Sequence, residues 1–239
     1  MEPLKNGFPK SAMVIMAHPD DAEFTVAGTV AKWTQAGCEV VYVLCTSGNA
    51  GTHEPGMTPE KIAAIREQEQ RAACHELGVK HVVFLGHDDG TLQPTLELRR
   101  ELVRQIRSFK PQVVITGDPT NLFNGDEYIN HPDHRAAGQA ALDAVFPAAS
   151  MPLLWSEDGE PHRVRYVYVS SAEKPNVWID ISSTIEIKII ALRQHKSQMG
   201  DWDPADMIRH WAAETGKEKG LAFAESFRRM ILERPETES

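Results

Sequence analysis

The chain has 239 residues, of which 41% are hydrophobic, and a formal net charge of −9. This composition can build a buried core and excludes a disordered chain, and the length suits a single domain spanning residues 1–239. The acidic balance, without a Lys/Arg-rich run, argues against nucleic acid or a membrane as a partner. An odd cysteine count without CxxC excludes a disulfide framework, and the N-terminus lacks the apolar stretch of a signal peptide, so we expect a cytoplasmic protein.

The first half of the chain alternates short apolar runs with stretches of helical periodicity. The runs that predict strands are 11–17, 39–45, 81–85 and 112–116, and the stretches that predict helices are 21–36, 58–77 and 96–109. Gly37 and Gly78 follow the first two helices as C-cap residues. This alternation with short loops predicts an α/β, Rossmann-like three-layer fold with a mostly parallel sheet and helices on both faces.

The second half of the chain is less regular. A long polar loop is expected over 117–130 and a helix over 132–146. Strands are expected over 164–169 and 176–179, and helices over 181–198 and 204–215, whereas 223–229 is amphipathic and of ambiguous type. A long loop inside an otherwise compact domain is often functional.

Two short segments carry most of the chemistry, namely AHPDD at 17–21 and HPDH at 131–134. Together they supply three imidazoles and three carboxylates, enough for a two-His, one-carboxylate metal site with a spare base and a spare acid. Catalytic zinc takes three protein ligands of nitrogen and oxygen type and leaves a fourth position for water. The two segments together therefore predict a metal-dependent hydrolase.

The expected location agrees with this chemistry, because open parallel sheets bind ligands at the carboxyl ends of their strands. His18 follows the first strand directly, and Pro19 biases it towards an extended conformation. Asp20 and Asp21 begin a helix, where the dipole favours ionised carboxylates. One of these two carboxylates can ligate the metal while the other faces the bound water.

The same segments resemble the LmbE-like (PIG-L) N-acetylglucosamine deacetylases. The resemblance extends over most of the chain and includes further matching positions: Arg66, Glu69, residues 77–79 (LGV), 89–90 (DG) and 191–198 (ALRQHKSQ). Within the family, residues 49–52 (NAGT) and 195–198 (HKSQ) look most like the diacetylchitobiose-deacetylase branch. Many relatives carry Glu directly after the second Asp, whereas here Ala22 precedes Glu23, and we therefore leave Glu23 outside the site.

The resemblance implies a role for each residue of the two motifs. It implies one zinc ion per chain, held by three ligands: His18, Asp21 and His134. Asp20 would be the general base, and His131 the acid that protonates the leaving amine, with Asp133 orienting it. The implied reaction is hydrolysis of the N-acetyl amide of an N-acetylglucosamine-type sugar, which releases acetate and the free amine.

Four further residues are candidates for contact with the substrate: Arg66, Tyr128, Asn130 and His195. The expected partner is a small amino sugar, and a homo-oligomer is left open. The roles of Glu23, Asp89, Trp202 and Trp211 also stay open, because turn formation or core packing would account for them equally well.

Three alternatives remain beside this prediction. The first is an amide hydrolase acting on a thiol-, inositol- or lipid-linked amino sugar. The second is a nucleotide-binding Rossmann module, which HPDD in place of a G-x-G-x-x-G cradle disfavours. The third is a non-catalytic metal-binding or lectin-like protein, which would have no need for Asp20 and His131.

Overall fold

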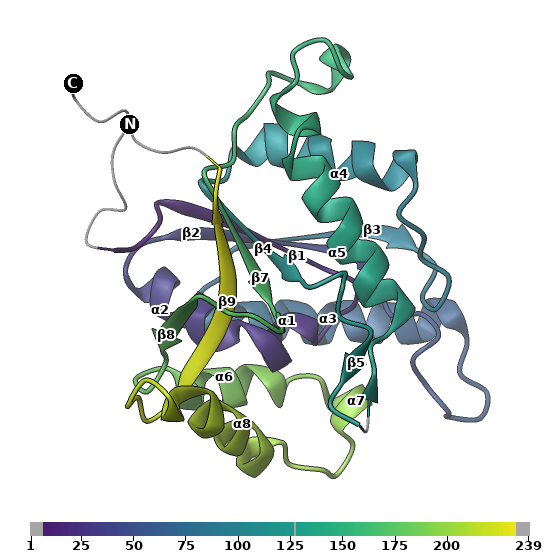
Figure 1. Ribbon diagram of the computed structural model, residues 1–239. Helices are drawn as coiled ribbons and strands as arrows, with labels where there is room; N and C mark the ends of the chain where they lie inside the picture. The colour runs from purple at the N-terminus through teal and green to yellow at the C-terminus, as the bar shows by residue number, and fades with distance from the viewer. Residues whose placement is uncertain (1–6, 127, 233–239) are drawn as a thin grey trace.

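The structure is a computed structural model that describes residues 7–126 and 128–232. Seven strands form one sheet in the order β3-β2-β1-β4-β7-β9-β8 (Figure 1). Five of them pair in parallel: β3 (His81–His87), β2 (Glu39–Thr46), β1 (Ser11–Met16), β4 (Val113–Gly117) and β7 (Tyr166–Ser170). The last strand of the chain, β9 (Ala224–Ile231), is antiparallel to both β7 and β8 (Val177–Asp180). The sheet is thus mostly parallel, as predicted.

Helices cover both faces of this sheet and bury two separate apolar clusters. Under one face lie α1 (Asp21–Thr25), α2 (Ala27–Gln35) and α3 (Pro59–Leu77), and over the other lie α4 (Leu96–Phe109) and α5 (Pro132–Val145) (Figure 1). A third cluster joins α6 (Ile185–Leu192) to α8 (Ala205–Lys217). These layers confirm the predicted three-layer α/β fold.

The order of the strands reverses beside β1. The chain passes from β1 to β2 and β3 on one side, and β4 then adds on the other side of β1. Ligands of open α/β sheets bind at such a switch point, outside the carboxyl ends of the strands. The segment after β1 and the segment between β4 and α5 both begin there, and they hold the AHPDD and HPDH motifs.

Several elements differ from the sequence prediction. The helix expected over 21–36 breaks at Val26, and the helix expected over 181–198 is interrupted between α6 and the short α7 (Lys196–Met199). The loop 117–130 contains a small hairpin of β5 (Phe123–Asn124) and β6 (Tyr128–Ile129). The region between α5 and β7 holds two 3₁₀ turns, Ala148–Ser150 and Ser156–Asp158, and the ambiguous tail is strand β9.

Among the described residues, none of the helices combines the length and apolar character that a membrane crossing requires.

Candidate metal centre and active site

The three histidines of the two motifs lie together, although His18 is more than a hundred residues away from His131 and His134 in the sequence. The ring of His18, just after β1, lies 4.9 Å from His131 and 5.2 Å from His134, measured between centroids. His131 is the N-cap of α5, and His134 lies in its first turn with the two rings 5.3 Å apart. The structure therefore brings both motifs into one site.

Both ring nitrogens of His18 have carboxylate neighbours. Its Nε2 lies 3.0 Å from Oδ1 of Asp89 and 3.2 Å from Oδ2 of Asp133. Because a carboxylate only accepts, these contacts place a proton on Nε2 and leave the lone pair of Nδ1 available to a metal. Nδ1 lies 3.6 Å from Oδ2 of Asp21.

Both ring nitrogens of His134 also have neighbours, but here Nδ1 faces a side-chain amide and Nε2 faces Asp21. Its Nδ1 lies 3.3 Å from Oδ1 of Asn130, while its Nε2 lies 2.9 Å from Oδ1 of Asp21. Because a carboxylate only accepts, Nε2 donates a proton to Asp21 at this distance, and a metal bound there would take the place of that proton. We had expected Asn130 to contact the substrate, but its amide is engaged with His134 and with the Asn121 carbonyl at 2.8 Å.

His131 has the opposite arrangement. Its Nδ1 accepts a hydrogen bond from the backbone N–H of Asp133 at 3.2 Å, so the neutral ring carries its proton on Nε2. A protonated nitrogen cannot bind a metal, and His131 is thus set up as a hydrogen-bond donor. Burial and the nearby imidazoles lower its pKa.

The expected role of Asp133 needs a correction. We had expected its carboxylate to orient His131, but this side chain is fully buried and contacts His18. It also accepts hydrogen bonds from the backbone N–H groups of Gly90 at 2.7 Å and Leu92 at 3.2 Å. Only the backbone of Asp133 contacts His131, because the N-cap geometry directs the side chain beneath α5.

His18 and His134 each place one ring nitrogen near a different oxygen of the Asp21 carboxylate. Nδ1 of His18 and Nε2 of His134 lie on either side of this carboxylate at 3.6 and 2.9 Å, a spacing compatible with zinc bonds of about 2.0–2.2 Å. Among the described residues, two groups have donor atoms that all lie within 4.8 Å of one another, namely His18 with His131 and His134, and His18 with Asp89 and Asp133; the set of His18, Asp21 and His134 is not one of them. The first of these would use the protonated nitrogen of His131, and the second would use the nitrogen of His18 that donates to carboxylates.

The electrostatic surroundings favour positive charge at this point. Burial lowers the pKa of His18, but hydrogen bonds to Asp133, Asp21 and Asp89 outweigh burial and raise it to about 12. Burial raises the pKa of Asp21, yet His134 and His18 hold it well below its usual value. A site that stabilises an extra proton this strongly is also suited to a bound cation.

Asp20 lies beside these residues in a strained backbone conformation. Its φ of 87° falls in the left-handed region, and its backbone N–H donates to Oε1 of Gln70 at 3.1 Å. Burial raises the pKa of Asp20 to about 6, although the Arg66 guanidinium acts against this. A carboxylate that titrates near neutral pH is suited to accepting and releasing a proton.

Arg66, for which a substrate contact stays a prediction, lies on α3 beside Asp20. Its largely buried side chain donates from Nη2 to the Pro19 carbonyl at 2.8 Å and to Oδ2 of Asp20 at 3.3 Å. Its Nη1 donates to the Gly48 carbonyl, and a Cβ at Gly48 would lie 2.2 Å from this nitrogen. Arg66 therefore positions Asp20 from behind.

His195 is also withdrawn from the site. We had expected a substrate contact, but the side chain has no exposed surface and its Nε2 lies 3.2 Å from Oε2 of Glu23. Oε1 of Glu23 accepts from Gln70, which in turn holds the backbone of Asp20. Glu23, which we had left outside the site, therefore belongs to a buried chain of contacts behind Asp20. No sequence pattern indicated a role for Gln70.

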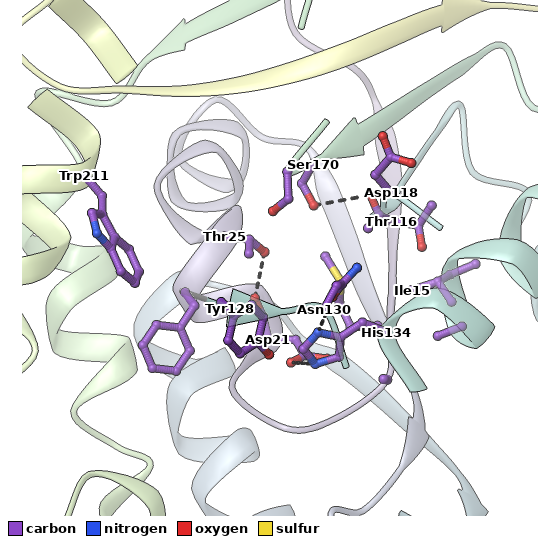
Figure 2. Close-up of a pocket in the computed structure, with 16 residues that line it drawn as sticks. Ile15, Asp21, Thr25, Thr116, Asp118, Tyr128, Asn130, His134, Ser170 and Trp211 are labelled. Atoms are coloured by element: carbon purple, nitrogen blue, oxygen red, sulfur yellow. Dashed lines mark hydrogen bonds and ion pairs between the residues drawn. The ribbon is translucent and has the colours of Figure 1, made fainter. Parts of the chain in front are cut away.

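A cavity of about 630 Å³ opens beside Asp21 and His134 (Figure 2). Of the predicted substrate contacts, Tyr128 and Asn130 line this cavity. Tyr128 lies on β6, half exposed, in front of Asp21. Trp211 of α8, whose role the sequence left open, forms part of the wall.

Comparisons with known proteins agree with this geometry. Residues 13–145, just over half of the chain, match the family described as PIG-L: GlcNAc-PI de-N-acetylase. Over 228 residues, the chain is 35% identical to the diacetylchitobiose deacetylase of Thermococcus kodakarensis, with 92% of this chain and 82% of the relative covered. The chain belongs to the PIG-L family. This confirms the resemblance that AHPDD and HPDH had suggested.

Two further PIG-L comparisons span most of the chain. A probable N-acetyl-alpha-D-glucosaminyl L-malate deacetylase 2 of Bacillus anthracis is 31% identical over 198 residues, which cover 79% of this chain and 81% of the relative. The solved structure of N,N'-diacetylchitobiose deacetylase from Pyrococcus horikoshii with its inhibitor MPG superposes with a TM-score of 0.87 at 30% identity, covering 96% of this chain and 87% of that one. As a PIG-L member with such relatives, the chain is a deacetylase and thus an amide hydrolase.

Proposed function

We propose that this deacetylase hydrolyses the acetamide of a small, soluble N-acetylglucosaminide and depends on one zinc ion held by His18, Asp21 and His134. The observation that carries the proposal is the division of roles around Asp21. Two imidazoles each place a ring nitrogen near this carboxylate, while Asp20 accepts from Arg66 and His131 accepts a backbone hydrogen bond at Nδ1 and keeps its proton on Nε2. Metal binding alone would not require these two flanking groups.

A zinc ion bound there would polarise the acetamide carbonyl and make a water molecule more acidic. Asp20 would take the proton of this water as the oxygen adds to the carbonyl carbon. The N–H on Nε2 of His131 would donate a hydrogen bond to the oxygen that becomes negative, and the proton that Asp20 takes from the water would be relayed through this nitrogen to the departing nitrogen. The C–N bond breaks, and the products are acetate and the free amino sugar. General acid–base help of this kind contributes roughly 10²–10⁴-fold.

The relatives act on different compounds. Their names specify diacetylchitobiose, N-acetylglucosaminyl malate and 1D-myo-inositol 2-acetamido-2-deoxy-glucopyranoside. The similarity to the diacetylchitobiose enzyme covers the largest share of the chain among these three, which supports an uncharged glycoside. An inositol-, thiol- or lipid-linked amino sugar is the alternative.

Acetate release tests the proposal. The purified chain should release acetate from N-acetylglucosamine or N,N'-diacetylchitobiose, lose this activity with a chelator and regain it with zinc. Asp20→Asn should keep its zinc and lose roughly 10²-fold or more in kcat. Absence of acetate from sugar, malate and inositol glycosides by a zinc-loaded chain would overturn the deacetylase assignment. Turnover of the inositol compounds alone would overturn only the substrate.

A further inference from the structure

The cavity beside the ligand residues has two chemically different walls. It runs from Asp21 and His134 across the carboxyl ends of β1, β4 and β7 to helix α8. Phe24 and Trp211 are aromatic residues that line the cavity. Figure 2 shows Trp211 on one side of it, and Thr116, Asp118 and Ser170 on the opposite side. At about 630 Å³ it falls within the range of pockets that bury whole small ligands, and it exceeds the volume of one pyranose ring.

Trp211 is available for stacking. The side chain is 51% exposed on α8, and its indole projects from the helix towards the centre of the cavity (Figure 2). A half-exposed aromatic ring offers a flat apolar surface with little entropy to lose on binding. Pyranose rings present a face of C–H groups that suits such a surface.

The polar wall has hydrogen-bonding capacity that the described protein residues do not use. The hydroxyl of Thr116 is buried and has no hydrogen-bond partner within residues 7–126 and 128–232. Oδ1 of Asp118 accepts from the N–H and hydroxyl of Thr120 at 2.8 and 2.6 Å, which fixes the carboxylate and leaves its second oxygen for a ligand. Buried polar atoms are normally satisfied, so an unsatisfied one at a cavity points to a ligand.

The charge of the cavity selects against anions. Among the lining residues that the structure describes there is no Lys or Arg, and the two carboxylates belong to Asp21 and Asp118. A carboxylate or phosphate on the ligand would face Asp118 without a counter-ion. Sugar hydroxyls, in contrast, can donate to this carboxylate.

We infer that this cavity binds a second, uncharged pyranose ring, the sugar joined to the N-acetylglucosamine that reacts. Trp211 stacks on the apolar face of this ring, while the carboxylate of Asp118 accepts from its hydroxyls. The inference rests on the proposed function and assigns Trp211 and Asp118 as residues that determine specificity. It also predicts that glycosides with an anionic aglycone, such as malate, are poor substrates.

The test compares kcat/KM for N,N'-diacetylchitobiose and N-acetylglucosamine in the wild type and in Trp211→Ala. The ratio of disaccharide to monosaccharide should fall about tenfold in Trp211→Ala, mainly through KM for the disaccharide. Trp202→Ala is the matched control, because Trp202 is similarly exposed at 49% but does not line the cavity. An unchanged ratio in Trp211→Ala, or an equal fall in Trp202→Ala, would overturn the inference.

Asp118→Asn tests the charge. It should raise the kcat/KM for the malate glycoside relative to that for diacetylchitobiose. Equal kcat/KM values of the wild type for the malate glycoside and the disaccharide would contradict the inference.

Calorimetric titration of diacetylchitobiose into Asp20→Asn, with and without Trp211→Ala, separates binding from catalysis. Weaker binding in the double variant supports the cavity assignment even if acetate release fails, and identical binding rejects it.

Discussion

At the scale of single residues, the site depends on which nitrogen of each imidazole is already engaged. Carboxylates at Asp89 and Asp133 occupy Nε2 of His18, and Asn130 occupies Nδ1 of His134. The other nitrogen of each ring faces one oxygen of Asp21. Partners of this kind fix the tautomer and the ring orientation of a ligand before the metal arrives.

Asp133→Ala tests this arrangement. The variant removes the buried carboxylate that holds His18 from Nε2 and binds the N–H groups of Gly90 and Leu92. Zinc affinity, measured by competition with a chelator of known affinity, should fall about 10–100-fold. Asp143→Ala on the same helix is the control, because Asp143 pairs with Arg99 away from the site. Equal zinc affinity in the two variants would show that the carboxylate does not orient His18.

At the scale of elements, strands and helices of the second half of the chain pack against helices of the first half. Glu225 of β9 accepts from the backbone N–H groups of Gly28 and Thr29 at the start of α2 and pairs with the buried Lys188 of α6. A Cβ at Gly28 would lie 2.7 Å from Ile181, so the approach needs glycine. These long-range contacts accompany the break at Val26, which turns α1 away from α2 beside the metal site.

Arg107 of α4 stabilises the irregular segment between α5 and β7. Its buried guanidinium donates to five backbone carbonyls, those of Ala148, Ala149, Met151, Leu154 and Trp155. Arg107→Met leaves these acceptors without their donor and should lower the free energy of unfolding by about 3 kcal/mol in urea denaturation. Arg104→Met, on the same helix but half exposed, should cost roughly 1 kcal/mol or less. A similar small loss in both variants would contradict this role.

The sequence predicted local features better than contacts between distant segments. The first strands, α3 and α4 follow from periodicity and caps such as Thr58 and Gly78, and the two motifs located the site. The positions of Arg66 and His195 could not be predicted, because they depend on how α3 and α7 pack behind Asp20. β9 was ambiguous because its pairing partners lie more than forty residues away.

At the scale of the whole molecule, the candidate metal site and the cavity meet at the switch point beside β1. Asp20 is held by Arg66 and Gln70 of α3, and the cavity lies at the carboxyl ends of β1, β4 and β7. His18, just after β1, is part of the candidate metal site.

A crystal structure of the zinc-loaded protein tests the central claim most directly. We predict zinc bound by Nδ1 of His18, by Asp21 and by Nε2 of His134 at about 2.0–2.2 Å, with Asp20 and His131 nearby but not bound to the ion. Zinc bound by His18, His131 and His134 together, or by His18 with Asp89 and Asp133, would contradict the account, because the acid or the residues that orient His18 would then be ligands.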